Sequence, residues 1–287
     1  MKILVLAKQV PDTRNVGKDA MKEDGTVNRA ALPAIFNPDD LCALEMALEA
    51  KARLQNAEVY VLTMGPARAA EIIREAIYRG ADKGFLLTDR KFAGSDTLAT
   101  SYAIAQAVKQ WQPQLIFCGL QAIDGDTAQV GPQTAEKLAI PQITYAEELV
   151  DINEKTIVVK RRLESGVETV VSTLPALVTV HGSAPACRMR NAKKVMQFKH
   201  ARTFSELKEE NNENAPLFKE RPYLLLEEWS AERVHADEQF LGLTGSPTKV
   251  KKIDNVVLVQ KENKILTSSD NDVEELMLEL LETRIIG

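Results

Sequence analysis

The chain has 287 residues and a formal net charge of −5. This acidic balance excludes proteins that bind nucleic acid through a basic face. No apolar run approaches the ~18 residues that a membrane-spanning helix needs, so we expect no membrane insertion. Three widely spaced cysteines, Cys42, Cys118 and Cys187, exclude a disulfide framework and an iron–sulfur site. The N-terminus lacks the cleavage site of a signal peptide, and we therefore expect a cytoplasmic protein.

Strand-like and helix-like segments alternate through the first half of the chain. Short apolar runs, typical of strands buried on both faces, occupy residues 2–7, 57–63, 84–88 and 114–119. Amphipathic segments, which predict helices, occupy residues 38–54, 67–80, 95–111 and 127–139. This alternation predicts a Rossmann-like, three-layer α/β fold in which helices cover a mostly parallel sheet.

Several of the predicted helices begin with residues that favour a helix N-terminus. Asn37 is a candidate N-cap, because Pro38 and two acidic residues follow it. Ser95-Asp96-Thr97 and Asp126-Thr127-Ala128-Gln129 are further N-cap signatures, and the latter resembles a capping box. Pro132 is poorly placed for a helix that begins at residue 127, so we expect a kink or a later start there.

The second half of the chain has a different character. Residues 156–160 and 167–181 predict strands joined by a turn at Glu164-Ser165-Gly166, which would add an antiparallel edge to the sheet. The chain is charged and irregular from 206 to 235, and residues 272–286 carry apolar side chains at helical spacing. We therefore predict an α/β nucleotide-binding domain over residues 1–202 and, over 203–287, an extended C-terminal arm that ends in a helix.

The stretch GLQAIDGDTAQVGP, residues 119–132, follows an apolar strand and contains no Lys, Arg or aromatic residue. Other polar loops at the same predicted sheet edge occupy residues 8–13, 37–40, 63–66 and 94–97. At that edge, small residues and free backbone N–H groups can hold a phosphate. Because neither Gly-x-Gly-x-x-Gly nor a P-loop is present, the pattern predicts an adenine-nucleotide site of unusual type. Ordinary loop and cap chemistry is the alternative.

Motifs along nearly the whole chain resemble those of one protein family. They include Val5-Leu6-Ala7-Lys8-Gln9-Val10, Met64-Gly65-Pro66 and Gly119-x-Gln121-Ala122-Ile123-Asp124. A signature stretch follows at Val159-x-Arg161-x-x-Glu164-x-Gly166-x-Glu168-x-Val170, and a late motif at Gly245-Ser246-Pro247-Thr248-x-Val250. In this combination the chain resembles the small, or beta, subunit of the electron-transferring flavoproteins. Residues 10–13 and 124–131 resemble those of electron-bifurcating members.

The resemblance implies a heterodimer with a larger, flavin-carrying alpha subunit, on which the C-terminal arm and helix pack. In a bifurcating member this chain binds FAD, which accepts hydride from NADH; in a non-bifurcating, respiratory member it binds AMP. Bifurcation sends one electron through the alpha-subunit FAD to a flavin-dependent dehydrogenase, either acyl-CoA dehydrogenase-like or a 2-hydroxy-acid dehydrogenase, and the other to ferredoxin. Such a chain is a component of an NADH-oxidising oxidoreductase of anaerobic metabolism, without a catalytic residue of its own. Outside this family, an adenine-nucleotide-binding regulatory module is the alternative.

Carried over by position, the cofactor contacts implied by the resemblance lie in the loops of the predicted sheet edge. They are Ala7, Val10, Pro11, Asp12, Thr13, Asn37, Asp40, Thr63, Met64, Gly65, Gly119, Gln121, Ala122, Asp124, Gly125, Asp126, Thr127, Gln129, Val130 and Gly131. We expect Gly125 to make room for the cofactor and Thr127 to offer a hydroxyl near its phosphates.

The basic segment over residues 184–202 matches the loop with which the family recognises partner dehydrogenases. Its expected docking residues are Arg188, Met189, Arg190, Lys193 and Lys194. The chain's three histidines are isolated from one another in the sequence, and we expect no metal site.

Overall fold

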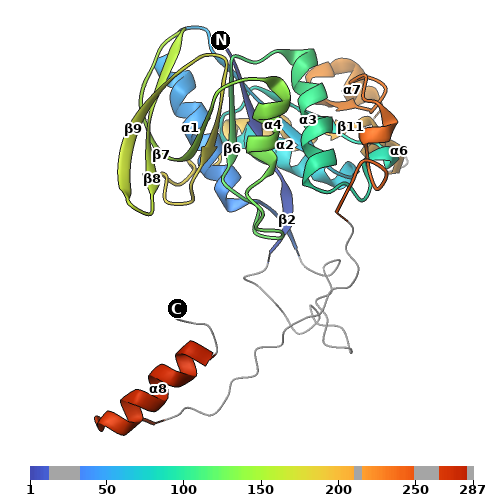
Figure 1. Cartoon of the computed structure of the whole chain (residues 1–287). Helices are drawn as coiled ribbons and strands as arrows, with labels where there is room; N and C mark the ends of the chain where they lie inside the picture. The colour runs from blue at the N-terminus through green and yellow to red at the C-terminus, as the bar shows by residue number, and fades with distance from the viewer. Residues whose placement is uncertain (13–32, 210–214, 249–264, 283–287) are drawn as a thin grey trace.

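The computed structural model describes residues 1–12, 33–209, 215–248 and 265–282. Within these residues, one 10-stranded sheet has the order β11-β12-β5-β4-β1-β6-β10-β7-β8-β9, and β2 and β3 form a separate pair. Helices cover both faces of the large sheet (Figure 1). The predicted α/β fold with a mostly parallel sheet and an antiparallel edge is confirmed.

The centre of the sheet is parallel and consists largely of the apolar runs that the sequence indicates as strands. Its strands are β1 (Lys2–Leu6), β4 (Glu58–Met64), β5 (Lys83–Leu87), β6 (Leu115–Gly119), β10 (Ala176–Val180) and β12 (Leu225–Trp229). Every residue of β6 and β10 is buried, as expected of strands that are covered on both faces. β1 pairs with β4 on one side and with β6 on the other.

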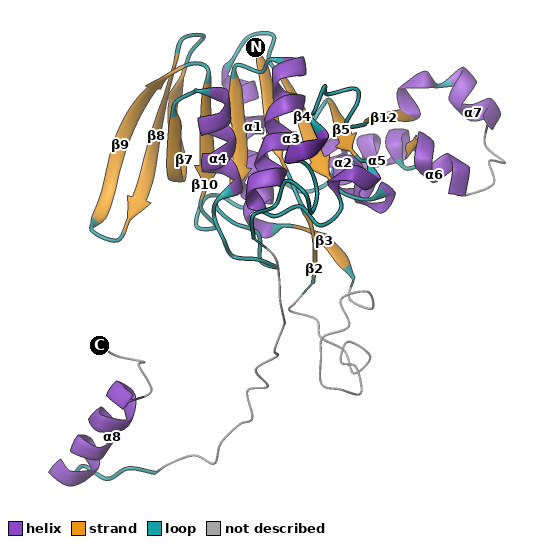
Figure 2. Ribbon diagram, turned by 45° about the vertical axis from the view of Figure 1, so that its right-hand side comes forward, coloured by secondary structure: helices purple, strands orange, loops and turns teal. Residues whose placement is uncertain are grey.

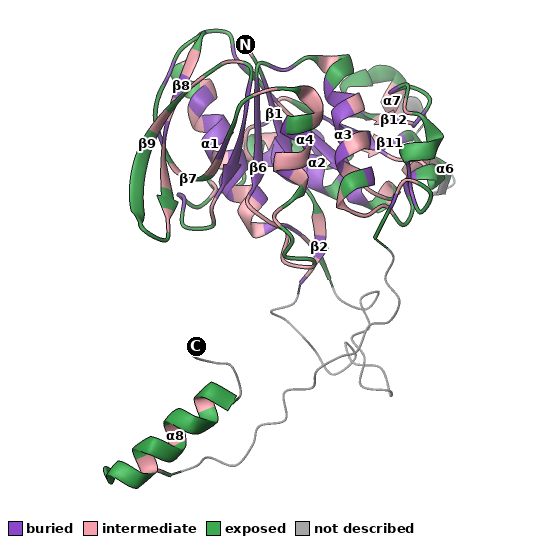
Figure 3. Ribbon diagram, in the orientation of Figure 1, coloured by how far each residue is buried: buried purple, intermediate pink, exposed green. Residues whose placement is uncertain are grey.

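The outer layers contain the helices predicted from the amphipathic segments. They are α1 (Pro38–Arg53), α2 (Ala70–Arg79), α3 (Thr97–Trp111) and α4 (Val130–Leu138). Ile3 and Val5 point to the core under α1, whereas Leu4 and Leu6 point to the core under α3. The side-chain alternation of β1 thus serves two cores, one on each face of the sheet. Figure 3 shows buried residues concentrated in the central strands and on the inner sides of these helices.

Beyond β10 the sheet continues into an antiparallel meander (Figure 2). Its strands are β7 (Gln142–Ile152), β8 (Thr156–Leu163) and β9 (Gly166–Thr173), and the turn predicted at 164–166 joins β8 to β9. β7 was not predicted, because two register shifts interrupt the alternation of its buried and exposed side chains. The interpretation of 167–181 as edge strands was incomplete, since β10 returns to the interior of the sheet and lies parallel between β6 and β7.

The short elements of the chain lie at the margins of the body. They are the strands β2 (Gln9–Pro11), β3 (Ala34–Phe36) and β11 (Arg202–Thr203), the helices α5 (Ala192–Phe198), α6 (Phe204–Glu209) and α7 (Ala215–Glu220), and the 3-10 helices η2 (Ala67–Ala69), η3 (Arg90–Phe92), η4 (Pro222–Leu224) and η5 (Glu238–Phe240). The prediction of an irregular segment from 206 to 235 was wrong, because β12 pairs in parallel with β5. Contacts with the body extend to Thr248, past the boundary predicted at residue 202.

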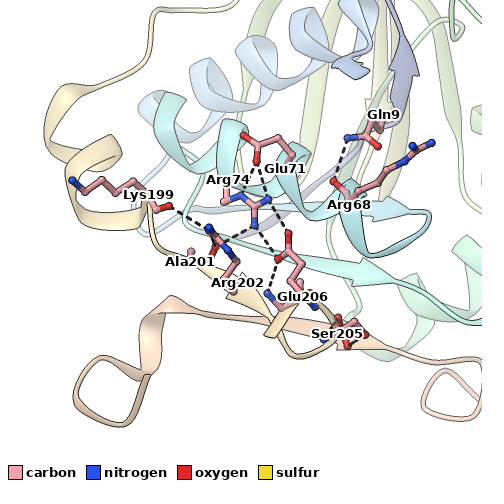
Figure 4. Close-up of polar contacts among 11 residues, drawn as sticks. Gln9, Arg68, Glu71, Arg74, Lys199, Ala201, Arg202, Ser205 and Glu206 are labelled. Carbon is pink, nitrogen blue, oxygen red and sulfur yellow. Dashed lines mark hydrogen bonds and ion pairs between the residues drawn. The ribbon is translucent and has the colours of Figure 1, made fainter. Parts of the chain in front are cut away.

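A buried ion pair joins α6, which lies past the boundary predicted at residue 202, to α2. The guanidinium of Arg74 donates to both carboxylate oxygens of Glu206, at 3.0 and 2.9 Å (Figure 4). It also donates to the backbone carbonyl of Ala201 and to the carboxylate of Glu71. Because Arg74 is buried, these partners are what make its burial tolerable, and they fix α6 and β11 beside α2.

The last described helix, α8 (Asp270–Glu282), stands apart from the α/β body in both views (Figures 1 and 2). It has no buried residue, and its apolar side chains Val273, Met277, Leu278 and Leu281 are about half exposed. The helix predicted over 272–286 begins at Asp270, and residues 283–287 lie outside the described part of the chain. Across the described residues, each helix is too short or too polar to cross a bilayer.

Candidate functional site

A cavity lies where the chain reverses direction across the sheet. From β1 the chain builds β4 and β5 on one side and then returns to β6 on the other. Ligands of open α/β sheets bind outside the carboxyl ends of the strands at such a reversal. The cavity has a volume of about 690 Å³, which is within the range of cofactor sites. Two segments enclose much of it: residues 118–131, called the loop wall below, and residues 88–97, called the outer wall.

The lining of the cavity combines a polar part with an apolar part. Polar residues of both walls line it, among them Thr127 of the loop wall and Arg90 and Asp96 of the outer wall. The apolar part consists of Leu6, Leu62, Met64, Phe92 and Ile104. Such a lining suits a ligand that has both a phosphate and a flat ring system.

The side chain of Asn37 bonds to the backbone of the loop wall and not to the first turn of α1. Its side chain is completely buried, and its amide nitrogen donates to the carbonyl of Gln121 at 2.8 Å. Its amide oxygen accepts the N–H of Ile123 at 3.2 Å. Asn37 occupies the N-cap position of α1 as predicted, but it makes no side-chain cap bond, because both ends of its amide bond to the loop wall. One buried side chain thus satisfies two backbone groups of the loop.

Asp40 joins the ends of β1 and β6 at the cavity. One carboxylate oxygen accepts the N–H of Lys8 at 2.8 Å, and the other accepts the N–H of Gly119 at 2.8 Å. Burial raises the pKa of Asp40 to about 7, although the two N–H donors favour the charged form. With a pKa of about 7 the carboxyl is only partly charged near neutral pH. Asp40 also lines the cavity.

The far end of the loop wall leads into the first turn of α4 at the cavity. α4 begins at Val130 after Gln129, without a side-chain cap bond, and both residues line the cavity. The capping box expected at residues 126–129 is thus absent, whereas the later helix start expected from Pro132 is confirmed. Asp126 and Ala128 have positive φ, a conformation that non-glycine residues adopt at some cost. An uncapped helix N-terminus favours an anion such as a phosphate.

The glycines of the loop wall are required for different reasons. A Cβ at Gly119 would lie 2.6 Å from Oδ1 of Asp40, and one at Gly131 would lie 2.8 Å from the sulfur of Cys118. Packing within the protein therefore requires these two glycines. A Cβ at Gly125 would meet nothing within 4 Å, although Gly125 lines the cavity. Within the protein itself, Gly125 could carry a side chain without a clash.

The outer wall is held by a distant segment, residues 230–248, called the strap below. The N–H of Ala231 donates to Asp89 at 3.1 Å, and the N–H of Gly242 donates to the hydroxyl of Ser95 at 3.2 Å. Asp96 caps α3 by accepting the N–H of Ala99 at 3.0 Å, which confirms the predicted cap. The outer wall thus depends on residues far along the chain.

Sequence reasoning missed part of the cavity lining. The missed residues are Leu6, Leu62, Thr88, Asp89, Arg90, Phe92, Ala93, Thr100, Ile104 and Cys118. A signal was available for those that directly follow the predicted strand 84–88, because the carboxyl end of every parallel strand reaches the same edge. The strap carried no such signal, since nothing local to residues 230–248 indicates which loop they cover.

Comparison with known proteins identifies the family. The model of the electron transfer flavoprotein domain matches residues 24–202. The chain belongs to the electron transfer flavoprotein family. It is 39% identical over 284 residues to the electron transfer flavoprotein subunit beta of Thermoanaerobacterium thermosaccharolyticum, with 99% of each chain covered. The resemblance drawn from the motifs, to the beta subunit of this family, is confirmed.

Two further relatives of this beta subunit carry more specific names. It is 50% identical over 182 residues to the acryloyl-CoA reductase electron transfer subunit gamma of Anaerotignum propionicum, covering 62% of this chain and 67% of the relative. It is 48% identical over 180 residues to the caffeyl-CoA reductase-Etf complex subunit CarD of Acetobacterium woodii, covering 62% and 68%.

Most cofactor contacts expected of an electron transfer flavoprotein beta subunit lie at the cavity. Those that line it are Ala7, Asp40, Met64, Gly65, Gly119, Gln121, Ala122, Gly125, Asp126, Thr127, Gln129, Val130 and Gly131. Val10 and Pro11 lie in β2 and Asp12 follows them, while Thr13 lies outside the described residues. Asp124 accepts an ion-paired hydrogen bond from Lys8 at 2.8 Å, and Thr63 is buried in β4.

Four of the five docking residues expected of the family divide into two groups, and the fifth, Lys194, is partly buried with its ammonium over the ring of Phe198. Arg188 pairs with Glu45 of α1, and Arg190 pairs with Glu75 of α2, both at 2.8 Å. These two arginines hold the basic segment against the helices. Met189, with 86% of its surface exposed, and Lys193, exposed at the start of α5, face solvent. The surface available to a partner therefore includes an apolar side chain as well as charge.

Proposed function

We propose that this beta subunit binds FAD in the cavity and acts in an electron-bifurcating heterodimer. When bound, FAD would accept a hydride from NADH and pass its two electrons separately, one through the alpha-subunit FAD to a flavin-dependent dehydrogenase and one to ferredoxin. The residues of this chain bind and orient the cofactor, and the redox chemistry belongs to the cofactor.

The apolar part of the cavity lining is the observation that favours FAD over AMP as the ligand. The loop wall and the start of α4 supply what an adenosine phosphate needs: small side chains, the Thr127 hydroxyl and uncapped N–H groups. AMP would leave Leu62, Phe92 and Ile104 without a ligand group. The isoalloxazine of FAD offers a flat ring system to cover these side chains, and removing them from water favours binding.

The charges around the loop wall are compatible with the two phosphates of FAD. Lys8 is ion-paired with Asp124, so it contributes little net positive charge. Asp40 is partly protonated near neutral pH, because burial raises its pKa to about 7. This lowers the repulsion that a full carboxylate would exert on a phosphate. Backbone N–H groups of α4 would then supply the favourable interaction.

The partners follow from the exposed surfaces and from the relatives' names. The half-exposed apolar side chains of α8 suit packing against the larger, alpha subunit. Two relatives are named as subunits that serve an acryloyl-CoA reductase and a caffeyl-CoA reductase. These names favour an acyl-CoA dehydrogenase-like partner over a 2-hydroxy-acid dehydrogenase for the docking surface around Met189 and Lys193.

Counting the nucleotides of the purified heterodimer tests this proposal. We expect a second FAD in addition to the one in the alpha subunit, and no AMP. AMP in place of the second FAD would show the non-bifurcating function. A heterodimer without nucleotide in this subunit would contradict both functions.

Gly125→Leu sharpens the assignment of the cavity. The protein has room for a side chain at this position, so the variant should fold and pair with the alpha subunit. We expect it to lose the second FAD, whereas Gly125→Ala, as the matched control, keeps most of it. Full FAD content in Gly125→Leu would show that the cofactor does not approach the loop wall.

A further inference from the structure

Ser246 is buried at the contact between the strap and the outer wall. Only 3% of its surface is exposed, whereas the neighbouring Pro247 and Thr248 are exposed. Its hydroxyl accepts the N–H of Asp96 at 2.8 Å and donates to the carbonyl of Gly242 at 2.6 Å. A small side chain whose donor and acceptor are both used inside the protein indicates a specific positional role.

Asp96 is the residue through which the strap reaches the cavity. One of its carboxylate oxygens accepts the N–H of Ala99 and so caps α3, while the other accepts the N–H of Thr248 at 3.0 Å. Asp96 also lines the cavity. The start of α3, the strap and the cavity thus meet at one carboxylate.

The next residue continues this connection to the opposite wall. The hydroxyl of Thr97 donates to the side-chain oxygen of Gln129 at 2.9 Å, and both residues line the cavity. Gln129 precedes the uncapped first turn of α4. A chain of hydrogen bonds therefore runs from Ser246 and Thr248, through Asp96 and Thr97, to the loop wall.

The backbone of the strap lies too close to the outer wall for this connection to be loose. Gly242 has a φ of +54°, and a Cβ there would lie 2.5 Å from the carbonyl oxygen of Lys91. Only glycine permits this approach. The strap consequently fixes the outer wall at its backbone as well as through Ser246.

We propose that Ser246 and Thr248 are positioning residues of the cofactor cavity. Acting through Asp96, they hold Thr97 and the outer wall at the distance from Gln129 that a nucleotide requires. The inference rests on the proposed function, because it takes the nucleotide site to be this cavity. It adds that affinity for the nucleotide is set in part by residues that do not line the cavity.

The test is Ser246→Ala in the heterodimer with its alpha subunit. After removal of the bound nucleotide, the Kd for FAD is measured by flavin fluorescence and the Kd for AMP by calorimetry. Losing the hydroxyl should weaken binding about three- to tenfold. Amide hydrogen exchange over residues 94–99 should become faster in the variant. Ser205→Ala is the matched control, because its hydroxyl bonds to Glu228 at the far edge of the sheet.

Asp96→Asn provides a second, independent variant. Asparagine caps a helix as well as aspartate does, but its amide leaves one oxygen to serve both Ala99 and Thr248. Losing a negative charge at the cavity would by itself strengthen the binding of a phosphate. Weaker binding of the nucleotide by this variant would therefore show that Asp96 positions the cavity wall. Stronger or unchanged binding would contradict the inference.

The outcomes separate this inference from the proposed function. If the wild-type heterodimer binds neither FAD nor AMP in this subunit, the proposed function fails. If the wild type binds nucleotide and Ser246→Ala binds it as tightly as Ser205→Ala does, the inference alone is overturned. A lower thermal midpoint of Ser246→Ala with an unchanged Kd would likewise overturn it, since it would show a purely structural role.

Discussion

The two walls of the cavity are held in different ways. The loop wall is held by Asn37 and Asp40, buried side chains that bond to its backbone. The outer wall is held by the strap, partly through exposed groups such as the ion pair between Lys91 and Glu238. An unpaired buried group costs far more free energy than a lost surface pair. Removing one of the buried contacts of the loop wall should therefore cost more stability than removing the exposed ion pair of the outer wall.

The largest effect is expected from Asn37→Ala. This change leaves the carbonyl of Gln121 and the N–H of Ile123 without their buried partner, which should lower the free energy of unfolding by about 2–4 kcal/mol. Urea denaturation measures this change. Asn153→Ala is the control, because Asn153 makes similar bonds in an exposed turn. Equal losses in the two variants would contradict the contrast between the walls.

Asp40→Asn should have the next largest effect, and the effect should depend on pH. Burial raises the pKa of Asp40 to about 7 in the folded protein, from an ordinary value of 3.8. Between these values the folded chain binds more protons, so the contribution of Asp40 to stability is full below about pH 4 and is lost as pH rises towards about 7.

The variant should remove this slope of about 2 kcal/mol between pH 5 and pH 8, because an amide does not titrate, whereas wild type loses stability as the Asp40 carboxyl ionises. The difference in unfolding free energy from wild type should therefore shrink from pH 5 to pH 8. Urea denaturation across that range gives the difference at each pH. A constant difference would show that Asp40 does not titrate in this range.

The smallest effect is expected from Lys91→Gln in the outer wall. Both side chains of the ion pair between Lys91 and Glu238 are exposed, and hydrogen bonding to Glu238 raises the pKa of Lys91. Salt screens such a pair, so the thermal midpoint should fall slightly in dilute buffer and match wild type in high salt. A large, salt-independent fall would mean that this exposed pair holds the outer wall as strongly as the buried side chains hold the loop wall.

The sequence predicts the central strands and their helices well, because a strand that is buried on both faces is a continuous run of apolar residues. The run before Gly119 is an example: it reads as a buried strand and forms one. The order of the strands in the sheet has no such local signal in the sequence. β10 therefore could not be placed between β6 and β7, and β12, with Glu227 and Glu228 in its strand, reads as charged chain.

The site was predictable to a similar extent. The edge of the sheet and the loop wall follow from residues 119–132, since loops at the carboxyl ends of parallel strands converge. The role of Asn37 did not follow. Its sequence neighbours favour a cap, but a tertiary contact with Gln121 and Ile123 competes for the same side chain. The outer wall and the strap likewise depend on contacts between residues far apart in sequence, which a local pattern does not carry.

The late positions of β10, β12 and the strap in the chain have a consequence for its synthesis. β6 gains its second neighbour only after β10 has been made, and β5 gains β12 later still. Ser246 and Thr248 come after both. A nascent chain that ends before Leu225 lacks a strand of the sheet, and one that ends before Thr248 lacks strap contacts that hold the outer wall. A nucleotide that requires both walls in place would therefore bind only after Thr248 has been made.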